Sequence, residues 1–260
     1  MAVNDNGVLA IAKSGPVALV TLNRPEVLNA LNFELRQKLR EAVTSINADA
    51  AIRVAIIKGA GSGFCSGADL SQGVGQSVCD ELETQYKPLL MDIALSDKLW
   101  MASMHGTAAG IGGSLAMACD LAVMAENANI YLAFAAIGLI PDGGATWHLL
   151  KAMGHKRALQ TIIEGRKIPA SQCLEFGLVN RLASPSSVHE AALRWAHELA
   201  RGAPLAQAAA KRALRHIGRM RLQDAITLEA KLQQKLVETE DHSNGVEAFL
   251  AKRKPEFKGR

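Results

Sequence analysis

The feature that most constrains the fold is a long stretch without charge. Residues 99–119, "LWMASMHGTAAGIGGSLAMAC", contain no Lys, Arg, Asp or Glu, and the stretch is long enough to cross a bilayer. It nevertheless holds His105, two serines, a threonine and four glycines, and no cluster of basic residues flanks it. These polar and turn-forming residues favour a buried strand, a turn and a buried helix over a membrane span. We therefore expect no membrane partner.

Apolar strands alternate with helices over the first half of the chain. Runs such as "PVALVTLN", "RVAIIKG" and "CDLAVMA" are typical of buried strands, whereas 32–49 and 78–96 have apolar residues at helical spacing. The connections between the strands are too long for hairpins, which favours parallel pairing and an α/β fold. From about residue 143 onward nearly all segments look helical. We predict an α/β core over 1–200 and a helical C-terminal region over 201–260.

Composition excludes several classes of function. The net charge is +4 and aromatic residues make up 4% of the chain, so neither a basic surface nor stacking rings for nucleic acid are evident. The four cysteines have no spacing typical of zinc sites or of a disulfide scaffold, and we expect no metal. With no export signal evident at the start, we expect reduced thiols in a cytoplasmic protein.

Two glycine-rich loops follow buried strands. Both "GAGSGFCSGADL" and "HGTAAGIGGSLAMACD" can present bare backbone N–H groups, because glycine allows sharp turns and the close approach of a ligand. Neither loop contains the Gly-Lys-Ser/Thr of a phosphate-binding P-loop, and neither meets the dinucleotide spacing GxGxxG between a strand and a helix. From the residues alone, tight turns and binding loops are both open interpretations.

A single aspartate ends the apolar run "IGLIPDGGATW". Asp142 follows a proline and precedes two glycines, a pattern typical of a turn and of a helix N-cap. Apolar neighbours would instead desolvate its carboxylate and raise its pKa, as a proton-transferring base requires. A carboxylate that caps a helix has its pKa lowered, so the two roles conflict. The apolar neighbours considered for this are Ile137, Leu139, Ile140 and Trp147.

The order of these segments resembles the crotonase family, the enoyl-CoA hydratase/isomerase superfamily. The resemblance covers nearly the whole chain, through "VALVTLNRPEVLNALN", "GFCSGADL", "HGTAAGIGGSLAMACDLAVMAENANI", "GLIPDGGATWHLLKAMG", "GLVNRLA" and "GVEAFLAKRKPEFKGR". It implies a ββα superhelix core and a helical C-terminal region used for trimerisation. It also implies an acyl-CoA or enoyl-CoA substrate, a homo-trimer or hexamer, and no cofactor besides the coenzyme A thioester that is the substrate itself.

The resemblance also assigns site residues. It places an oxyanion hole at the backbone N–H groups of Ala68 and Ile111, one from each glycine loop. A helix N-terminus favours negative charge, which suits the second of these donors. The positions matching the family's coenzyme A contacts are Arg24, Val27, Leu28, Ser66, Ala68, Asp69, Leu70, Phe249 and Lys252. In the family the C-terminal contacts often come from a neighbouring subunit. The residues expected to shape the acyl pocket are Ser114, Phe134 and Trp147.

One departure from the family's hydratases decides the predicted reaction. Those enzymes carry two glutamates, and the matching positions here are Ser114 and Phe134. Hydration needs one group to activate water and another to donate a proton, so ordinary hydration is not expected. The remaining carboxylate, Asp142, matches the base of isomerases, and the motifs resemble most the phenylacetyl-CoA-type branch. We therefore predict an enoyl-CoA isomerase with Asp142 as proton shuttle, acting on aliphatic or aromatic acyl groups.

Three alternatives stay open. In the first, the chain is a hydratase. In the second, it is a dehalogenase or thioesterase with Asp142 as nucleophile. In the third, it is a catalytically weak acyl-CoA-binding paralogue. A nucleophilic Cys65 is a further hypothesis, although no partner base is evident nearby. We interpret His148 as a packing or surface residue. Asp69 and Asp120 are expected to fix loop ends by accepting hydrogen bonds from backbone N–H groups.

Overall fold

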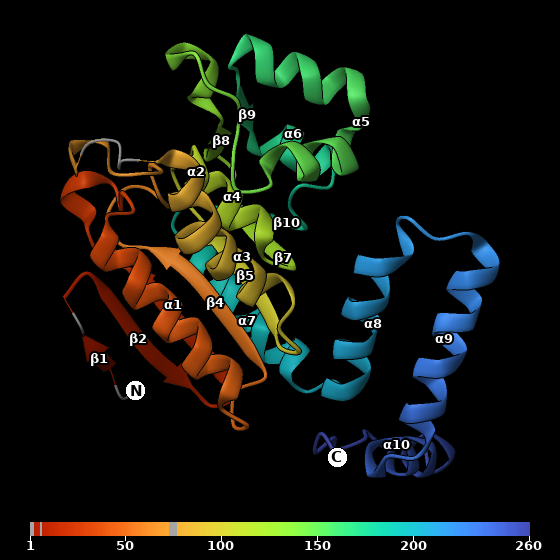
Figure 1. Ribbon diagram of the computed structural model, residues 1–260. Coiled ribbons are helices and arrows are strands. Elements are labelled where there is room, and N and C mark those ends of the chain that lie inside the picture. Colours follow the sequence, from red (N-terminus) through yellow and green to blue (C-terminus); the bar gives the residue numbers. More distant parts are fainter. Residues whose placement is uncertain (1–2, 6, 73–76) are drawn as a thin grey trace.

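A seven-stranded sheet forms the centre of the fold, and Figure 1 shows its position in the computed structural model, which describes residues 3–5, 7–72 and 77–260. The strand order is β1-β2-β3-β4-β5-β7-β10. The first three strands pair antiparallel, and those from β3 to β10 pair parallel, as the long connections predicted. The bounds are β1 Val3–Asp5, β2 Leu9–Ser14, β3 Val17–Leu22, β4 Val54–Gly59, β5 Leu99–Met104, β7 Leu121–Ala125 and β10 Arg181–Ala183.

A second, three-stranded sheet begins where the uncharged stretch turns. It consists of β6 (Thr107–Ala109), β8 (Asn129–Tyr131) and β9 (Lys167–Pro169), in the order β6-β8-β9. Chain segments that leave the larger sheet after β5 and β7 thus enter the smaller one. The prediction that strands nearly vanish after residue 143 missed β9 and β10. Each has three residues, which is too short for hydropathy to alternate visibly.

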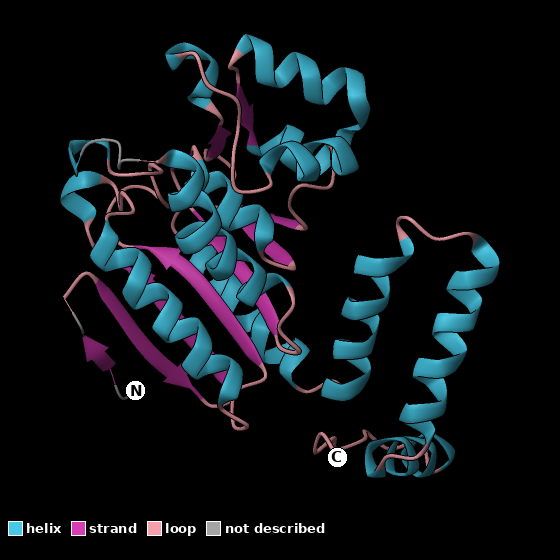
Figure 2. Cartoon of the chain, viewed as in Figure 1, coloured by secondary structure: helices cyan, strands magenta, loops and turns pink. Residues whose placement is uncertain are grey.

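Helices cover both faces of the larger sheet. Helix α1 (Phe33–Ala48) packs on β2 and β3 in front of the sheet, whereas α7 (Val188–Ala200) packs behind it on the parallel strands (Figures 1 and 2). The predicted helix 78–96 is divided into α2 (Val78–Glu81), a π-helical turn η3 (Leu82–Tyr86) and α3 (Lys87–Ala94). The remaining elements of the core are η1 Pro25–Val27, η2 Leu70–Gln72, α4 Ile111–Ala118, η4 Ala133–Ile137, α5 Ala145–Glu164 and α6 Ala170–Glu175.

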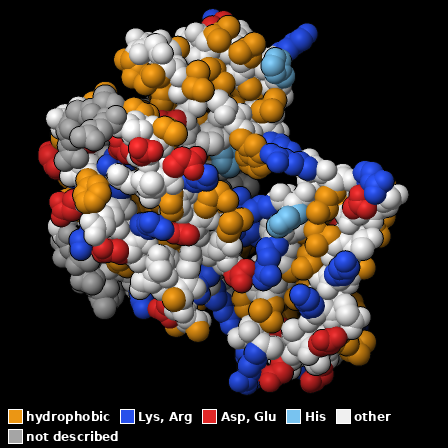
Figure 3. All heavy atoms as spheres, in the orientation of Figure 1, with side chains coloured by type: hydrophobic (Ala, Val, Ile, Leu, Met, Phe, Trp, Pro, Cys, Tyr) orange, Lys and Arg blue, Asp and Glu red, His pale blue; other side chains and the backbone are white. Residues whose placement is uncertain are grey.

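Three C-terminal helices extend from the core, as predicted. They are α8 (Pro204–Ile217), α9 (Leu222–Val237) and α10 (Glu240–Leu250), and Figure 3 shows hydrophobic side chains along them. Helix α8 is fastened to the core by the buried Lys211, whose Nζ lies 2.7 Å from Asp120 Oδ2. Asp120 also accepts a hydrogen bond from the Trp100 N–H, which confirms the role expected of it. The domain boundary at residue 200 stays a prediction.

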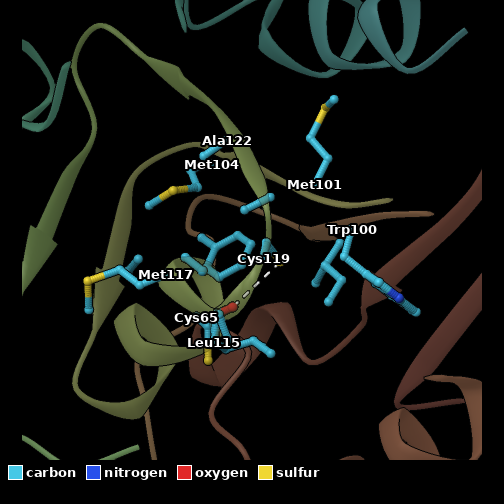
Figure 4. Packing of buried hydrophobic residues seen from close by; sticks show 14 of the residues in the cluster. Cys65, Trp100, Met101, Met104, Leu115, Met117, Cys119 and Ala122 are labelled. Carbon is cyan, nitrogen blue, oxygen red and sulfur yellow. Dashed lines mark hydrogen bonds between the residues drawn. The ribbon is translucent and has the colours of Figure 1, made fainter. Parts of the chain in front are cut away.

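The core explains why residues 99–119 lack charge. Every residue of α4 is buried, and β5 is buried along almost its whole length. Figure 4 shows Leu115 of α4 beside Cys65, with Cys119 donating to the Leu115 carbonyl, whereas Met101 of β5 points away from them. Burial of such apolar surface stabilises the fold by roughly 25 cal/mol per Å². Among the described helices none is both long and apolar enough to span a membrane.

Candidate active site

The first glycine loop is held in an extended conformation beside two other segments. Leu31 forms a parallel bridge with Ala68, and Cys65 forms one with Ala108. The Leu31 N–H donates to the Gly67 carbonyl at 2.7 Å, and the Asp69 N–H donates to the Leu31 carbonyl. In a parallel pair the residue between two such bonds turns its own N–H to the other side. The Ala68 N–H therefore points away from Leu31.

The second glycine loop lies directly against the first. A Cβ added at Gly67 would lie 3.0 Å from the Ala109 carbonyl oxygen and 3.5 Å from the Gly110 Cα, and the φ of Gly67 is +101°. Only glycine fits both the contact and the dihedral angle. Ile111 is the first residue of α4, so its N–H has no partner within the helix. The fold thus brings the Ala68 and Ile111 segments together, and each leaves a backbone donor available for a ligand.

A buried asparagine that the sequence reasoning missed braces the first loop. The Asn29 Nδ2 donates to the carbonyls of Ala60 and Gly63, both at 2.9 Å, and its side chain is fully buried. Arg24 lies beside it and contacts Asp69 Oδ2 at 2.8 Å. Asp69 also accepts the Ser71 N–H, as expected of a residue that fixes a loop end. The quoted run "RPEVLNALN" contained this signal, but no local pattern showed that its asparagine would be buried.

Seven of the nine positions assigned to coenzyme A gather around this loop. Among them Val27, Leu28 and Leu70 expose apolar side chains, and the Ser66 hydroxyl donates to the Val27 carbonyl at 3.1 Å. The other two lie at the opposite end of the molecule: Phe249 is in the last turn of α10, and Lys252 follows that helix (Figure 1). A single chain therefore does not bring all nine together. The seven are Arg24, Val27, Leu28, Ser66, Ala68, Asp69 and Leu70.

Asp142 does not cap a helix. Helix α5 begins at Ala145, its N-cap is Gly144, and no side chain caps it. The Asp142 Oδ1 is buried and has no hydrogen-bond partner within the described part of the chain. Burial raises the pKa of Asp142 to about 6, and the negative charge of Glu81 also raises it, whereas its own backbone N–H lowers it. The capping interpretation is therefore wrong, and the carboxylate is a desolvated titratable group.

The desolvation does not come from the residues expected to supply it. Ile137, Leu139 and Ile140 are 61%, 56% and 75% exposed, and Trp147 is 41% exposed. This prediction was wrong: the run leaves η4 through Gly138, where φ is +73°, and its side chains are exposed on both sides of that turn. The carboxylate of Asp142 is instead buried by the segment around it, in which both Pro141 and Ala145 are buried.

The acyl-pocket candidates separate into two groups. Ser114 is fully buried, and its hydroxyl donates to the Asp142 carbonyl at 2.8 Å. The Phe134 ring is buried and lies against the second glycine loop, 3.8 Å from where a Cβ at Gly110 would be. Trp147 instead lines a cavity of about 600 Å³ between α4, α5 and α8, which none of Asp142, Ser114 and Phe134 lines. The structure thus brings Ser114 and Phe134, but not Trp147, to the glycine loops and Asp142.

Known proteins of similar sequence and fold come from one family. The model of the enoyl-CoA hydratase/isomerase family matches residues 12–260. A probable enoyl-CoA hydratase of Rhodobacter capsulatus is 39% identical over 94% of this chain and 95% of its own. A 1,2-epoxyphenylacetyl-CoA isomerase of Escherichia coli is 33% identical over 94% of this chain and 95% of its own. An enoyl-CoA hydratase structure from Bacillus anthracis has a TM-score of 0.92 and 30% identity, covering 97% of this chain and 100% of that chain.

The chain belongs to the enoyl-CoA hydratase/isomerase family. Its fold is the crotonase fold, and its substrates are therefore of the acyl-CoA class. The relatives include both hydratases and an isomerase, so membership alone does not select the reaction.

A polar group near Asp142 was also missed by the sequence reasoning. Arg36 of α1 contacts Glu81 Oε1 at 2.5 Å and donates to the Tyr86 hydroxyl at 2.8 Å. The pKa of Tyr86 is raised to about 12, mainly by burial and to a smaller extent by the charges of Glu81 and Asp142, whereas Arg36 lowers it. Since Arg36 neutralises Glu81, one side of the site carries a paired charge. Nothing local in the sequence connects α1 with the π-helical turn that carries Tyr86.

Other nucleophile and metal candidates do not fit. Cys65 is fully buried, and burial raises its pKa to about 12, so the hypothesis of a reactive thiolate is wrong. Burial lowers the pKa of His148 to about 4, which keeps it neutral, in keeping with a packing role. No cluster of His, Cys, Asp and Glu suited to a metal ion occurs within residues 3–5, 7–72 and 77–260.

The raised pKa of Asp142 predicts how stability depends on pH. The folded chain holds this proton up to about pH 6, whereas the unfolded chain releases it near the ordinary aspartate pKa of 3.8. The folded state binds more protons between these values, so its stability falls as the pH rises through them. Asp142→Asn should therefore match the wild type at about pH 4 and exceed its unfolding free energy by about 2 kcal/mol above about pH 6.5.

Denaturant unfolding at fixed protein concentration, repeated across this pH range, measures the difference. Asp97→Asn is the control, because Asp97 is an exposed aspartate on the surface. A wild-type stability that rises over this window relative to Asp142→Asn contradicts the raised pKa.

Proposed function

We propose that the chain shifts a double bond of an enoyl-CoA thioester, with Asp142 as the proton shuttle. The observation that supports this most is a single desolvated carboxylate in the site, with a pKa of about 6, where the family's two hydratase glutamates are replaced by Ser114 and Phe134. One carboxylate suffices to remove a proton from one carbon and return it to another. A pKa near the working pH suits a group that must act as base and then as acid.

The two glycine loops would supply the electrostatic part of the reaction. The N–H groups of Ala68 and Ile111 donate to the thioester oxygen as negative charge develops on it. The N-terminus of α4 favours the same charge. Asp142 removes the proton, the dienolate forms, and the protonated Asp142 returns the proton to the distal carbon. Phe134, beside the second loop, provides an apolar wall for the acyl group.

Hydration is the second candidate. It is favoured by the hydratases among the relatives and by Glu81, whose charge acts on Asp142 and which would be a second carboxylate. Arg36 holds Glu81 in an ion pair, so this carboxylate is engaged by a cation and is not free to act on a substrate or a water molecule. We therefore rank isomerisation first. The reactions differ in product, because hydration yields a hydroxyacyl-CoA.

We also propose that the chain assembles as a homo-trimer or a hexamer. Leu214, Leu222 and Phe249 are 76%, 77% and 82% exposed on the C-terminal helices, and the segment 137–140 is exposed and apolar. Exposed apolar surface of this kind marks a contact surface. In such an assembly the Phe249 and Lys252 of a neighbouring subunit would reach the coenzyme A around Arg24. A cytoplasmic location remains part of this proposal.

Proton transfer by Asp142 predicts isotope exchange. Wild-type protein, incubated in deuterium oxide with a panel of aliphatic and aromatic enoyl-CoAs, should exchange protons at C2 and C4 and move the double bond. Asp142→Asn should lower both rates by about 10²–10⁴-fold, since it removes the acid–base group. Mass spectrometry and NMR measure the exchange.

The products formed in the same experiment distinguish isomerisation from the alternative reactions. Hydroxyacyl-CoA would establish hydration, whereas halide or free coenzyme A would establish a nucleophilic Asp142. Tight binding without turnover, equal in wild type and Asp142→Asn, would favour the binding paralogue.

If the Ile111 N–H is part of an oxyanion hole, replacing Ile111 with proline should strongly lower kcat. Ile111→Pro removes a single N–H at the first position of α4, where proline is compatible with a helix. The loss of one such donor should lower kcat by about 10²–10³-fold. Ile111→Ala, which keeps the N–H and removes most of the buried side chain, is the matched control and should retain most activity. Equal losses in the two variants would show that the side chain, not the donor, matters.

Assembly predicts the mass in solution. Sedimentation equilibrium should give three or six times the chain mass of 27.7 kDa. Phe249→Glu, placed on the exposed face of α10, should shift the protein towards smaller species if this face is the contact. A wild-type mass of one chain contradicts the assembly.

A further inference from the structure

Ser114, at the position that matches a hydratase glutamate, makes a specific contact with Asp142. Its side chain is fully buried on α4, and its hydroxyl donates to the backbone carbonyl of Asp142 at 2.8 Å. The same carbonyl accepts the Ala145 N–H at 3.0 Å. The peptide that follows Asp142 is therefore held by two elements, α4 and the start of α5.

The next residue shows how closely this loop lies on α4. Gly143 has a φ of +57°, and a Cβ added to it would lie 2.8 Å from the Ser114 Cβ and 3.1 Å from its Oγ. The same Cβ would lie 3.1 Å from the Ile111 Cγ1. A larger side chain at either position would displace the loop. The small Ser114 and Gly143 together allow the close approach.

This anchoring has a consequence for the Asp142 carboxylate. An aspartate two residues before a helix N-cap can reach the free N–H groups of the first turn, which would stabilise its charge. Here no side chain caps α5, and the Asp142 Oδ1 is buried without a partner within the described residues. A fixed carbonyl limits the rotation of the peptide, and hence the reach of the side chain.

We propose that Ser114 is a positioning residue for Asp142: its hydroxyl fixes the Asp142 carbonyl on α4 and so keeps the carboxylate in the buried site, away from the N-terminus of α5. This inference rests on the proposed proton-shuttle function. The charged and titratable groups that act on Asp142 from neighbouring elements are Glu81 of α2 and Tyr86 of η3, with Arg36 of α1 paired to Glu81.

The test compares two serines of equal burial. Ser114→Ala removes the anchoring hydroxyl. Ser103→Ala is the matched control, because Ser103 is also fully buried and hydrogen-bonded, to His189 at 2.8 Å, on the central strand β5. Ser114→Cys keeps a weaker donor of similar size and should give intermediate values. Thermal unfolding at one protein concentration verifies that the variants are folded.

Steady-state kinetics and pH profiles give the first measurement. A shift of the base by about 1 Å can lower the rate about 10²-fold. We expect Ser114→Ala to lower kcat by about 10- to 100-fold with KM changed less than about twofold, and to move the acidic limb of kcat/KM to lower pH. The limb moves because a released carboxylate accepts backbone N–H donors. Kinetics and a pH limb equal to those of Ser103→Ala would overturn the proposal.

A measurement independent of activity separates this inference from the proposed function. Carbon-13 NMR of aspartate-labelled protein, with the Asp142 signal assigned by its loss in Asp142→Asn, follows the titration directly. In Ser114→Ala the titration midpoint should fall by about one pKa unit or more. If the midpoint falls but no variant or wild type exchanges protons, the positioning role holds and the proposed function fails. An unchanged midpoint overturns the positioning role.

Discussion

The contact between two backbone loops at Gly67 is the constraint on which the site depends. The bridge from Leu31 to Ala68 aligns the first loop, and that from Cys65 to Ala108 aligns it with the strand before the second. The Ala68 N–H becomes available because its neighbours carry the hydrogen bonds of the first bridge, and the Ile111 N–H because Ile111 is the first residue of α4. Such donors cannot move with a side-chain rotamer, so they are preorganised for the charge that the proposed reaction develops on a thioester oxygen.

The acid–base group, in contrast, depends on side-chain identity. At the two positions where the family's hydratases carry glutamates, this chain has a hydroxyl that binds a carbonyl and a phenyl ring that packs on the second loop. The site therefore keeps the part made of backbone and changes the part made of side chains. The relatives of this chain include both hydratases and an isomerase.

Sequence reasoning succeeded where the determinants were local or repeated. Alternation of apolar strands and long connections predicted the parallel sheet, and the loop motifs predicted the assembly around Arg24 and Ala68. It failed where the determinant was a contact between distant segments. Apolar composition suggested that Ile140 desolvates Asp142, but this side chain is exposed, which depends on the path of the chain and not on local composition. For the same reason the sequence did not connect Arg36 with Tyr86, or Ser114 with the Asp142 carbonyl.

A lone carboxylate imposes a condition that a pair does not. Two carboxylates can divide the roles of base and acid between them, whereas in the proposed isomerisation Asp142 performs both, which requires a pKa near the working pH. A second negative charge at position 114 would raise that pKa further, and the group would remain protonated and unable to act as a base. Glu81 raises it too, but Arg36 compensates that charge, so burial remains the main cause. A neutral Ser114 therefore allows Asp142 to ionise near the working pH, whereas a glutamate at position 114 would not. The residue at position 114 and the role of Asp142 thus depend on each other.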